Sequence, residues 1–286
     1  MIGVTYSEEQ LHLNTFTIFT RQWLTEGAKA TLFVQHGYAE HSGRYKHVGE
    51  YFANHKYNVF MMDLPGHGQS SGIEGAPRTY IDSFETYITT INQFVDTMKT
   101  KMESKNIILP MFFMGHSMGG LLTSVLAGRR SEMKGFIASA PAYIIKNTGL
   151  NLFSWAIQGI LKFNPYLTAD MDSPSNIITN QEVAREYVTD PFNVCSKACA
   201  MTSLEMKSYG EVEKDRDLDI PFYLFHGSGD TLIDVKGARI KATHLNNPVS
   251  KYVEYPGANH VLLEEDNKFE MLDGVEKWVD SLIENK

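Results

Sequence analysis

Several features that would restrict the function of this chain are scarce or missing. Acidic residues outnumber basic ones, 34 to 26, and the net charge of −8 opposes binding to nucleic acid or to an anionic surface. No apolar run reaches the length, about 18 residues, that a membrane-spanning helix needs. The N-terminal segment MIGVTYSEEQ lacks the basic start and apolar stretch of a secretory signal. We therefore expect a cytoplasmic protein with no nucleic-acid partner.

Cysteine is nearly absent as well, with only Cys195 and Cys199 in the segment CSKAC. If this segment is helical, the two thiols lie one turn apart, in a geometry that suits neither a disulfide nor a zinc site. Two reduced thiols are then expected, as in a reducing compartment.

What the sequence does contain is a regular alternation of short apolar runs with longer amphipathic ones. The short runs are predicted strands, and they lie at residues 30–37, 57–66, 107–115, 134–141, 221–230 and 251–257. Most are apolar on both faces, and predicted helices such as 80–103 and 118–130 separate them, which indicates a largely parallel sheet covered by helices. The segment 11–24 alternates between polar and apolar residues, so it predicts an antiparallel edge hairpin.

This alternation stops at residue 142 and resumes near residue 214. The interval is far longer than an ordinary connection of about four to six residues, so we expect an insertion. The sequence therefore predicts one discontinuous core, residues 1–141 and 214–286, with a mostly helical cap at 142–213 over the end of the sheet. Within the cap, apolar residues recur at helical spacing in the segment 150–163, namely Leu152, Phe153, Ala156, Ile157, Ile160 and Leu161, with Trp155 and Phe163 beside them.

The segment FFMGHSMGG combines a strand end, a GxSxG pattern and the start of a helix around Ser117. This setting is typical of a nucleophile elbow, in which a strained turn lifts the serine hydroxyl above the carboxyl ends of the strands. Gly115 and Gly119 are expected where strand and helix bend back on each other and any side chain would collide. The simpler alternative, a glycine-rich turn whose serine caps the helix, is less consistent with the whole pattern.

A serine hydroxyl needs a histidine base and an acid that orients it, here in the chain order serine, acid, histidine. His226 precedes the best acid and His244 lies in a predicted helix, which leaves His260 on a loop after a strand. Asp230 directly follows the strand 221–230, whereas Asp234 could simply cap the next helix. We therefore predict Ser117, Asp230 and His260 as the catalytic triad, with Asp234 as the second choice for the acid.

The oxyanion of an acyl-transfer reaction needs two N–H donors. We predict the backbone N–H groups of Met118, after the serine, and of Tyr38, in the loop after the strand 30–37. The nearby His36, His41 and His67 have no metal-ligand spacing, so we expect structural hydrogen bonds from them and no metal site. The glycines of DLPGHGQSSG lack the lysine of a phosphate loop and predict a turn beside the active site.

Five segments, HGYAEHSGRY, DLPGHGQSSG, GHSMGG, HGSGD and GANHVLLEE, occur in this order. Together they resemble the α/β-hydrolase superfamily, and within it the monoglyceride lipase and lysophospholipase branch. The resemblance implies the α/β-hydrolase fold and the same triad and oxyanion donors, and it adds Glu40, Arg44 and Tyr187 near the polar end of the substrate pocket. For Glu40, His41 and Arg44, an ordinary buried hydrogen-bonded cluster is an equally good interpretation. Tyr38 and Ala39 stand where the family usually has a small residue and then glycine, which implies a narrower pocket.

The sequence thus predicts a serine hydrolase that acts on carboxylic esters, most consistently on monoacylglycerols or related single-chain lipids, with no cofactor. The amphipathic cap segment is expected to line an acyl tunnel and to give weak, peripheral membrane contact. Two alternatives remain open. Another hydrolase of this fold, such as a short-chain carboxylesterase or a serine aminopeptidase, would use the same residues. A non-catalytic small-molecule-binding protein on a hydrolase scaffold would typically have lost a triad member.

Overall fold

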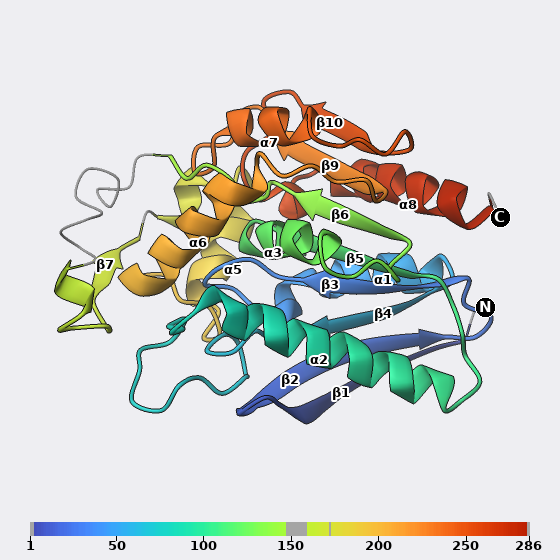
Figure 1. Ribbon diagram of the computed structural model, residues 1–286, viewed down its shortest axis with the longest axis horizontal. Coiled ribbons are helices and arrows are strands. Elements are labelled where there is room, and N and C mark those ends of the chain that lie inside the picture. Colours follow the sequence, from blue (N-terminus) through green and yellow to red (C-terminus); the bar gives the residue numbers. More distant parts are fainter. Residues whose placement is uncertain (1–2, 147–158, 172, 285–286) are drawn as a thin grey trace.

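A central eight-stranded sheet organises the protein in the computed structural model, which describes residues 3–146, 159–171 and 173–284 (Figure 1). The strand order is β1-β2-β4-β3-β5-β6-β9-β10; β1, β2 and β4 pair antiparallel, and every other pair is parallel. These strands are β1 (Val4–Leu13), β2 (Phe16–Thr25), β3 (Ala30–Gln35), β4 (Tyr57–Met62), β5 (Met111–His116), β6 (Gly135–Ser139), β9 (Phe222–Gly227) and β10 (Lys251–Tyr255). The predicted mostly parallel sheet is therefore confirmed.

Helices cover both faces of the sheet and make two apolar clusters, because successive residues of a strand point to opposite faces. Phe113 packs on one face with helices α2 and α3, and Phe112 packs on the other face with α1 and α8. The longer helices are α1 (Lys46–Asn54), α2 (Phe84–Glu103), α3 (Met118–Ala127), α5 (Gln181–Thr189), α6 (Ala200–Glu213), α7 (Val235–Ala242) and α8 (Lys268–Glu284). The 3₁₀ turns are η1 (Ser42–Tyr45), η3 (Pro174–Asn176) and η4 (Leu262–Glu264).

The predicted strands all exist, but several are shorter than their apolar runs. The run 107–115 begins as a loop, and β5 starts only at Met111, because Pro110 has no N–H to donate to a ladder. The run 57–66 ends its strand at Met62, ahead of the turn around Pro65. The predicted hairpin is β1 and β2, with Asn14 at a φ of 55° in the turn; β1 forms the edge, and β2 also pairs with β4.

The described part of the predicted cap contains the expected helices and also a small sheet, which was not predicted. β7 (Thr168–Asp170) and β8 (Lys197–Cys199) pair antiparallel. Cys199 ends β8 and Cys195 lies in the loop before it, so the helical interpretation of this segment is wrong, although both thiols are free. Figure 1 shows β7, α5 and α6 gathered at one end of the sheet, away from the C-terminus.

The apolar segment 150–163 lies largely outside the described residues, so its predicted helix can be followed only at its end. There, Leu161 is buried, whereas Ile160 and Phe163 are exposed, Phe163 at 92% of its surface. Among the described residues, none of the helices is both long and apolar enough to cross a bilayer. The division into core and cap at residues 142 and 213 stays a prediction.

Candidate active site

Ser117 lies in the sharp turn between β5 and α3. Its backbone has φ 54° and ψ −115°, a conformation that costs a non-glycine residue about 1–3 kcal/mol. The turn is held by the Ser117 N–H, which donates to the Ser139 carbonyl at 2.9 Å, and by the Ser117 carbonyl, which accepts from Leu121 and Ala142. Such a strained conformation persists only where the surrounding structure holds it, and these three hydrogen bonds hold the backbone of Ser117. The hydroxyl stands at the carboxyl end of β5.

Two glycines make this turn possible. A Cβ atom on Gly115 would collide with the Gly119 carbonyl, and one on Gly119 would lie 2.5 Å from the carbonyl oxygens of Gln35 and His36. The helix therefore folds back directly onto the strand ends, as the sequence predicts. Neither position can accept a side chain without a shift of backbone.

A hydrogen-bonded chain joins the three predicted triad residues. The Nε2 atom of His260 lies 2.9 Å from the Ser117 Oγ, and its Nδ1 lies 2.7 Å from Oδ2 of Asp230. Oδ1 of Asp230 accepts from the N–H groups of Leu232 and Ile233, both at 2.8 Å. All three side chains are largely or fully buried, so the arrangement is shielded from bulk water.

Electrostatics keep the Asp230 carboxyl ionised. Burial by itself raises its pKa, but the charge of His260 and the hydrogen bonds from His226 and His260 outweigh this effect and hold the pKa well below its usual range. His226 was not predicted in the site, yet its Nε2 lies 2.9 Å from Oδ2 of Asp230. Its position four residues before the acid, in the strand that leads to it, was the only signal available in the sequence.

The predicted oxyanion donors flank the serine. Met118 is the first residue of α3, so its N–H has no partner within the helix. Tyr38 follows Gly37, on which a Cβ atom would lie 3.1 Å from the Ser117 Cβ. The loop after β3 thus passes directly beside the serine, where the Tyr38 N–H can complete a pair of donors.

This loop, residues 37–41 and the predicted oxyanion loop, is bonded to the predicted cap at several points. The Tyr38 hydroxyl accepts from the Cys199 N–H at 2.8 Å and bonds to the Thr79 hydroxyl at 2.8 Å. The Ala39 carbonyl accepts from the Val194 N–H at 2.8 Å. These contacts hold Ala39 at a φ of 66°, which is unusual for a residue with a side chain. The Tyr38 ring is therefore part of the link between cap and loop.

The three residues added by the resemblance lie together in a buried polar cluster. Oε1 of Glu40 accepts from the Gly37 N–H and from the Tyr45 hydroxyl, both at 2.6 Å. The Arg44 guanidinium bonds to Glu264 at 2.8 Å and lies 4.5 Å from the centre of the Tyr187 ring. The Tyr187 hydroxyl donates to the Ala39 carbonyl at 3.4 Å.

These contacts favour the buried-cluster interpretation for Glu40. Its carboxylate holds the oxyanion loop from within, and Tyr187 holds the same loop from the cap. Burial raises the pKa of Glu40, although Arg44 and the hydrogen bonds oppose the shift. The cluster shapes the site by fixing the loop.

The remaining candidates have structural partners. The Asp234 side chain caps α7 by accepting from the Lys236 N–H at 2.9 Å, and His244 bonds to Asp217 at 3.0 Å. The His36 Nε2 accepts from the Leu64 N–H at 2.9 Å, and burial lowers the pKa of His36 to about 4. Within the described ranges, no group of histidine, cysteine and acidic side chains could hold a metal ion.

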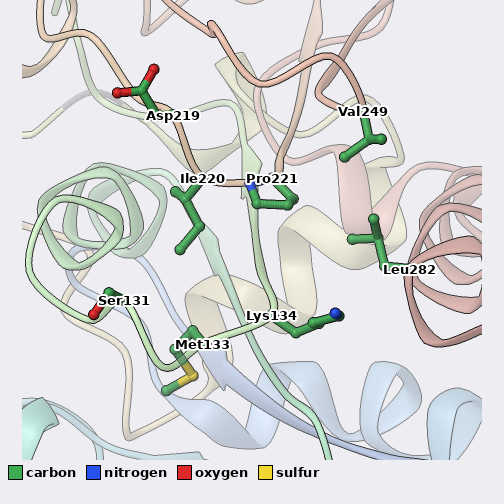
Figure 2. Close-up of a pocket in the computed structure, with 8 residues that line it drawn as sticks. All are labelled: Ser131, Met133, Lys134, Asp219, Ile220, Pro221, Val249 and Leu282. Atoms are coloured by element: carbon green, nitrogen blue, oxygen red, sulfur yellow. The ribbon is translucent and has the colours of Figure 1, made fainter. Parts of the chain in front are cut away.

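A separate cavity of about 550 Å³ lies far from this site (Figure 2). Lys134, Pro221 and Val249 line it, and each precedes a strand of the sheet. The cavity therefore sits at the amino ends of the strands, opposite to Ser117, and Ile220 and Leu282 give it apolar walls. It takes no part in the chemistry of the hydrogen-bonded chain.

Comparison with known proteins shows the family to which the chain belongs. The model of the family described as serine aminopeptidase, S33, matches residues 26–267. The chain belongs to this family of α/β-hydrolases. Among its relatives, the monoglyceride lipase of Homo sapiens is 31% identical over 87% of this chain and 81% of the relative. The monoglyceride lipase of Mus musculus is 30% identical over 93% of this chain and 88% of the relative.

The fold of this family member also has a close match among solved structures. A soluble variant of the monoglyceride lipase from Saccharomyces cerevisiae, in complex with a substrate analogue, superposes with a TM-score of 0.83. The match covers 96% of this chain and 94% of the other at 19% identity, a level at which it bears on the fold alone.

Proposed function

We propose that this chain is a monoacylglycerol lipase that works through an acyl-serine intermediate. The observation that carries the proposal is the chain of hydrogen bonds from Ser117 through His260 to Asp230, at 2.9 and 2.7 Å, on a strained nucleophile turn. The chain is an ester hydrolase of the α/β-hydrolase class, and its relatives named above carry the name monoglyceride lipase. That name supports the choice of substrate.

In the first half of the reaction, Ser117 attacks the ester carbonyl. Nε2 of His260 takes the hydroxyl proton, while Asp230 holds the proton on Nδ1 and stabilises the imidazolium that forms. The N–H groups of Tyr38 and Met118 bind the oxyanion, and each such donor contributes about 3–4 kcal/mol to transition-state stabilisation. His260 then gives its proton to the leaving glycerol oxygen, and the acyl group stays on Ser117.

In the second half, water replaces the alcohol. His260 accepts a proton from the water, the resulting hydroxide attacks the acyl carbonyl, and the tetrahedral intermediate is bound by the same two N–H groups. When it collapses, the Ser117 oxygen leaves and takes the proton back from His260. The products are a fatty acid and the free enzyme.

Two other substrates fit the same residues, since triad and fold do not fix the leaving group. The family is described as serine aminopeptidase, which keeps an aminoacyl amide in consideration, and a narrow pocket beside Tyr38 would favour a short ester. A non-catalytic binding role is disfavoured because no triad member is lost or displaced.

A substrate panel separates these possibilities. The wild-type chain is given a long-chain monoacylglycerol, a matched lysophospholipid, a short-chain nitrophenyl ester and an aminoacyl amide, and kcat/KM is compared. We expect the highest value for the monoacylglycerol. A higher value for the short ester or the amide would move the assignment to a general esterase or an aminopeptidase, and no hydrolysis at all would favour the binding role.

Weak membrane contact is the second part of the proposal. Ile160 and Phe163 expose apolar surface at the described end of the cap segment, where a shallow and reversible insertion into lipid is feasible. Phe163→Glu should reduce co-sedimentation with phosphatidylcholine vesicles while hydrolysis of the short ester stays unchanged. If both proteins sedimented equally with the vesicles, or if the wild type did not sediment with them at all, the proposed membrane contact would be wrong.

A further inference from the structure

A second histidine contacts the carboxylate of the proposed triad. Nε2 of His226 lies 2.9 Å from Oδ2 of Asp230, the same oxygen that lies 2.7 Å from Nδ1 of His260. His226 is fully buried near the end of β9, and Asp230 follows the same strand. Because His226 precedes the acid in the chain, it is excluded as the catalytic base, and it has no other assigned role in the reaction.

The other ring nitrogen of His226 determines which atom carries the proton. Nδ1 is buried and has no hydrogen-bond partner among the described residues. A proton there would be an unsatisfied buried donor, which costs about 1–3 kcal/mol. The proton therefore sits on Nε2, and the ring donates it to Asp230. This bond is the one polar contact that the described structure gives the His226 side chain.

With this bond, the hydrogen-bonding capacity of the Asp230 carboxylate is filled. Oδ1 accepts from two backbone N–H groups, at Leu232 and Ile233, and Oδ2 accepts from His226 and His260. An ionised carboxylate offers about four acceptor sites. Removal of one donor leaves an acceptor site empty, holds the group less firmly and concentrates its charge on the donors that remain.

We propose that His226 is a positioning residue for the hydrolysis, whose Nε2–H fixes Oδ2 of Asp230 against Nδ1 of His260. This inference rests on the proposed roles of Ser117, Asp230 and His260. Two effects follow. The carboxylate stays in the orientation that keeps the His260 proton on Nδ1, and its charge is shared between two rings. Without His226, Asp230 would stabilise the imidazolium form of His260 more strongly.

The other charged and titratable groups around this pair come from neighbouring elements. The Lys146 ammonium donates to the Asp230 carbonyl oxygen, and the His116 ring centre lies 5.0 Å from that of His260. On β10, Glu254 is the register partner of His226 and forms an ion pair with Arg239 at 2.6 Å. A variant at position 226 leaves all of these groups in the chain.

The test compares two substitutions at this position in the whole protein. His226→Phe keeps a ring but loses the donor, and we expect kcat to fall about 10- to 100-fold with KM within about twofold, since a small misplacement of catalytic groups has costs of this size. The acid limb of the profile of kcat/KM against pH should move to higher pH. His226→Gln can donate an amide N–H to Oδ2 and should restore most of kcat and the wild-type acid limb.

A control separates positioning from plain stability. Leu224→Ala removes buried apolar volume from the same strand and from a residue outside the site, so it should lower the melting temperature without moving the acid limb. If His226→Phe does not fold, His226→Asn takes its place, because its shorter side chain cannot reach Oδ2.

A failure of the His226 inference can be told apart from a failure of the proposed function. Wild type and Ser117→Ala are assayed alongside with the same ester, and a loss of hydrolysis in Ser117→Ala supports the triad whatever position 226 does. If His226→Phe, or His226→Asn in its place, had the wild-type kcat and the wild-type acid limb, the inference would be overturned. A folded His226→Gln as slow as His226→Phe would overturn it as well.

Discussion

Nε2 of His260 lies 2.9 Å from the Oγ of Ser117, although 143 positions separate the two residues in the chain. The parallel sheet brings them together, because β5 and β10 end at the same edge and each passes its last residues into a loop above that edge. Asp230 arrives there in the same way, from β9. Three strand ends therefore place three chemically different groups within hydrogen-bond distance of one another.

Asp230 and Asp234 provide a matched test of the acid. Asp230→Asn should lower kcat by about 10⁴-fold, because the amide cannot hold His260 in the tautomer that accepts the Ser117 proton. Asp234→Asn should leave kcat unchanged, since asparagine caps a helix about as well as aspartate does. Initial rates with a soluble ester measure both. Equal losses in the two variants would contradict the assignment of the acid.

The turn at Ser117 predicts a sharp difference between two glycines. Gly119→Ala places a Cβ atom 2.5 Å from two backbone carbonyl oxygens, so it should either prevent folding or displace the helix and cost at least tenfold in kcat. Gly159→Ala meets no heavy atom within 4 Å and should change neither activity nor melting temperature by much. A fully active and stable Gly119→Ala would show that the turn is more open than described.

Tyr38 should couple the cap to the oxyanion loop through its hydroxyl. Tyr38→Phe removes the bonds to Cys199 and Thr79, each worth about 0.5–1.5 kcal/mol, so kcat/KM should fall about tenfold while the ring keeps its packing. Tyr6→Phe is the control, because the Tyr6 hydroxyl donates to Glu8 on an edge strand and has no contact with the loop 37–41 among the described residues. Steady-state kinetics would disprove the coupling if both variants matched the wild type.

Acid should destabilise the fold through its buried histidines. The pKa of His36 is lowered from 6.5 to about 4 by burial, and burial also holds the pKa values of His67 and His116 well below their ordinary value. Above pH 6.5 both the folded and the unfolded His36 are neutral. Between pH 6.5 and about 4 the unfolded state binds a proton that the folded state does not, so stability is lost as the pH falls.

For His36 alone, the loss over this interval is about 3 kcal/mol. Urea denaturation at pH 7, 6, 5 and 4.5 measures the free energy of unfolding directly. An unfolding free energy that stays constant from pH 7 to pH 4.5 would mean that these histidines are not held neutral in the folded protein.

The sequence was sufficient for the six strands β3, β4, β5, β6, β9 and β10, because runs that are apolar on both faces are typical of strands buried between two helix layers. It also singled out Ser117, Asp230 and His260, since each follows a strand and the residue types fit one chemistry. The contact between His226 and Asp230 was not predicted, because a histidine within an apolar strand has many possible partners. The strand pair β7 and β8 was missed for a similar reason: three residues carry too little periodicity to indicate a strand.

For Tyr38, too, the local sequence pattern was informative but the tertiary contact of the side chain was not predicted. Its backbone position was predicted from the loop after β3, but the partner of its hydroxyl, the Cys199 N–H, lies 161 residues away in the cap. Such a contact depends on how the cap rests on the core, which no spacing in the sequence records. Glu40 was assigned through a resemblance, and only its bond to the Gly37 N–H indicates that it acts on the loop.

Hydrolysis of a long-chain monoacylglycerol by the wild type and by Ser117→Ala tests the nucleophile most directly. Both proteins are compared at equal concentration after thermal unfolding has shown that both are folded. We predict that the wild type releases fatty acid and that the variant is slower by about 10⁴- to 10⁶-fold. Comparable release by Ser117→Ala would contradict the mechanism, because the hydrogen-bonded chain from His260 and Asp230 would then serve no nucleophile.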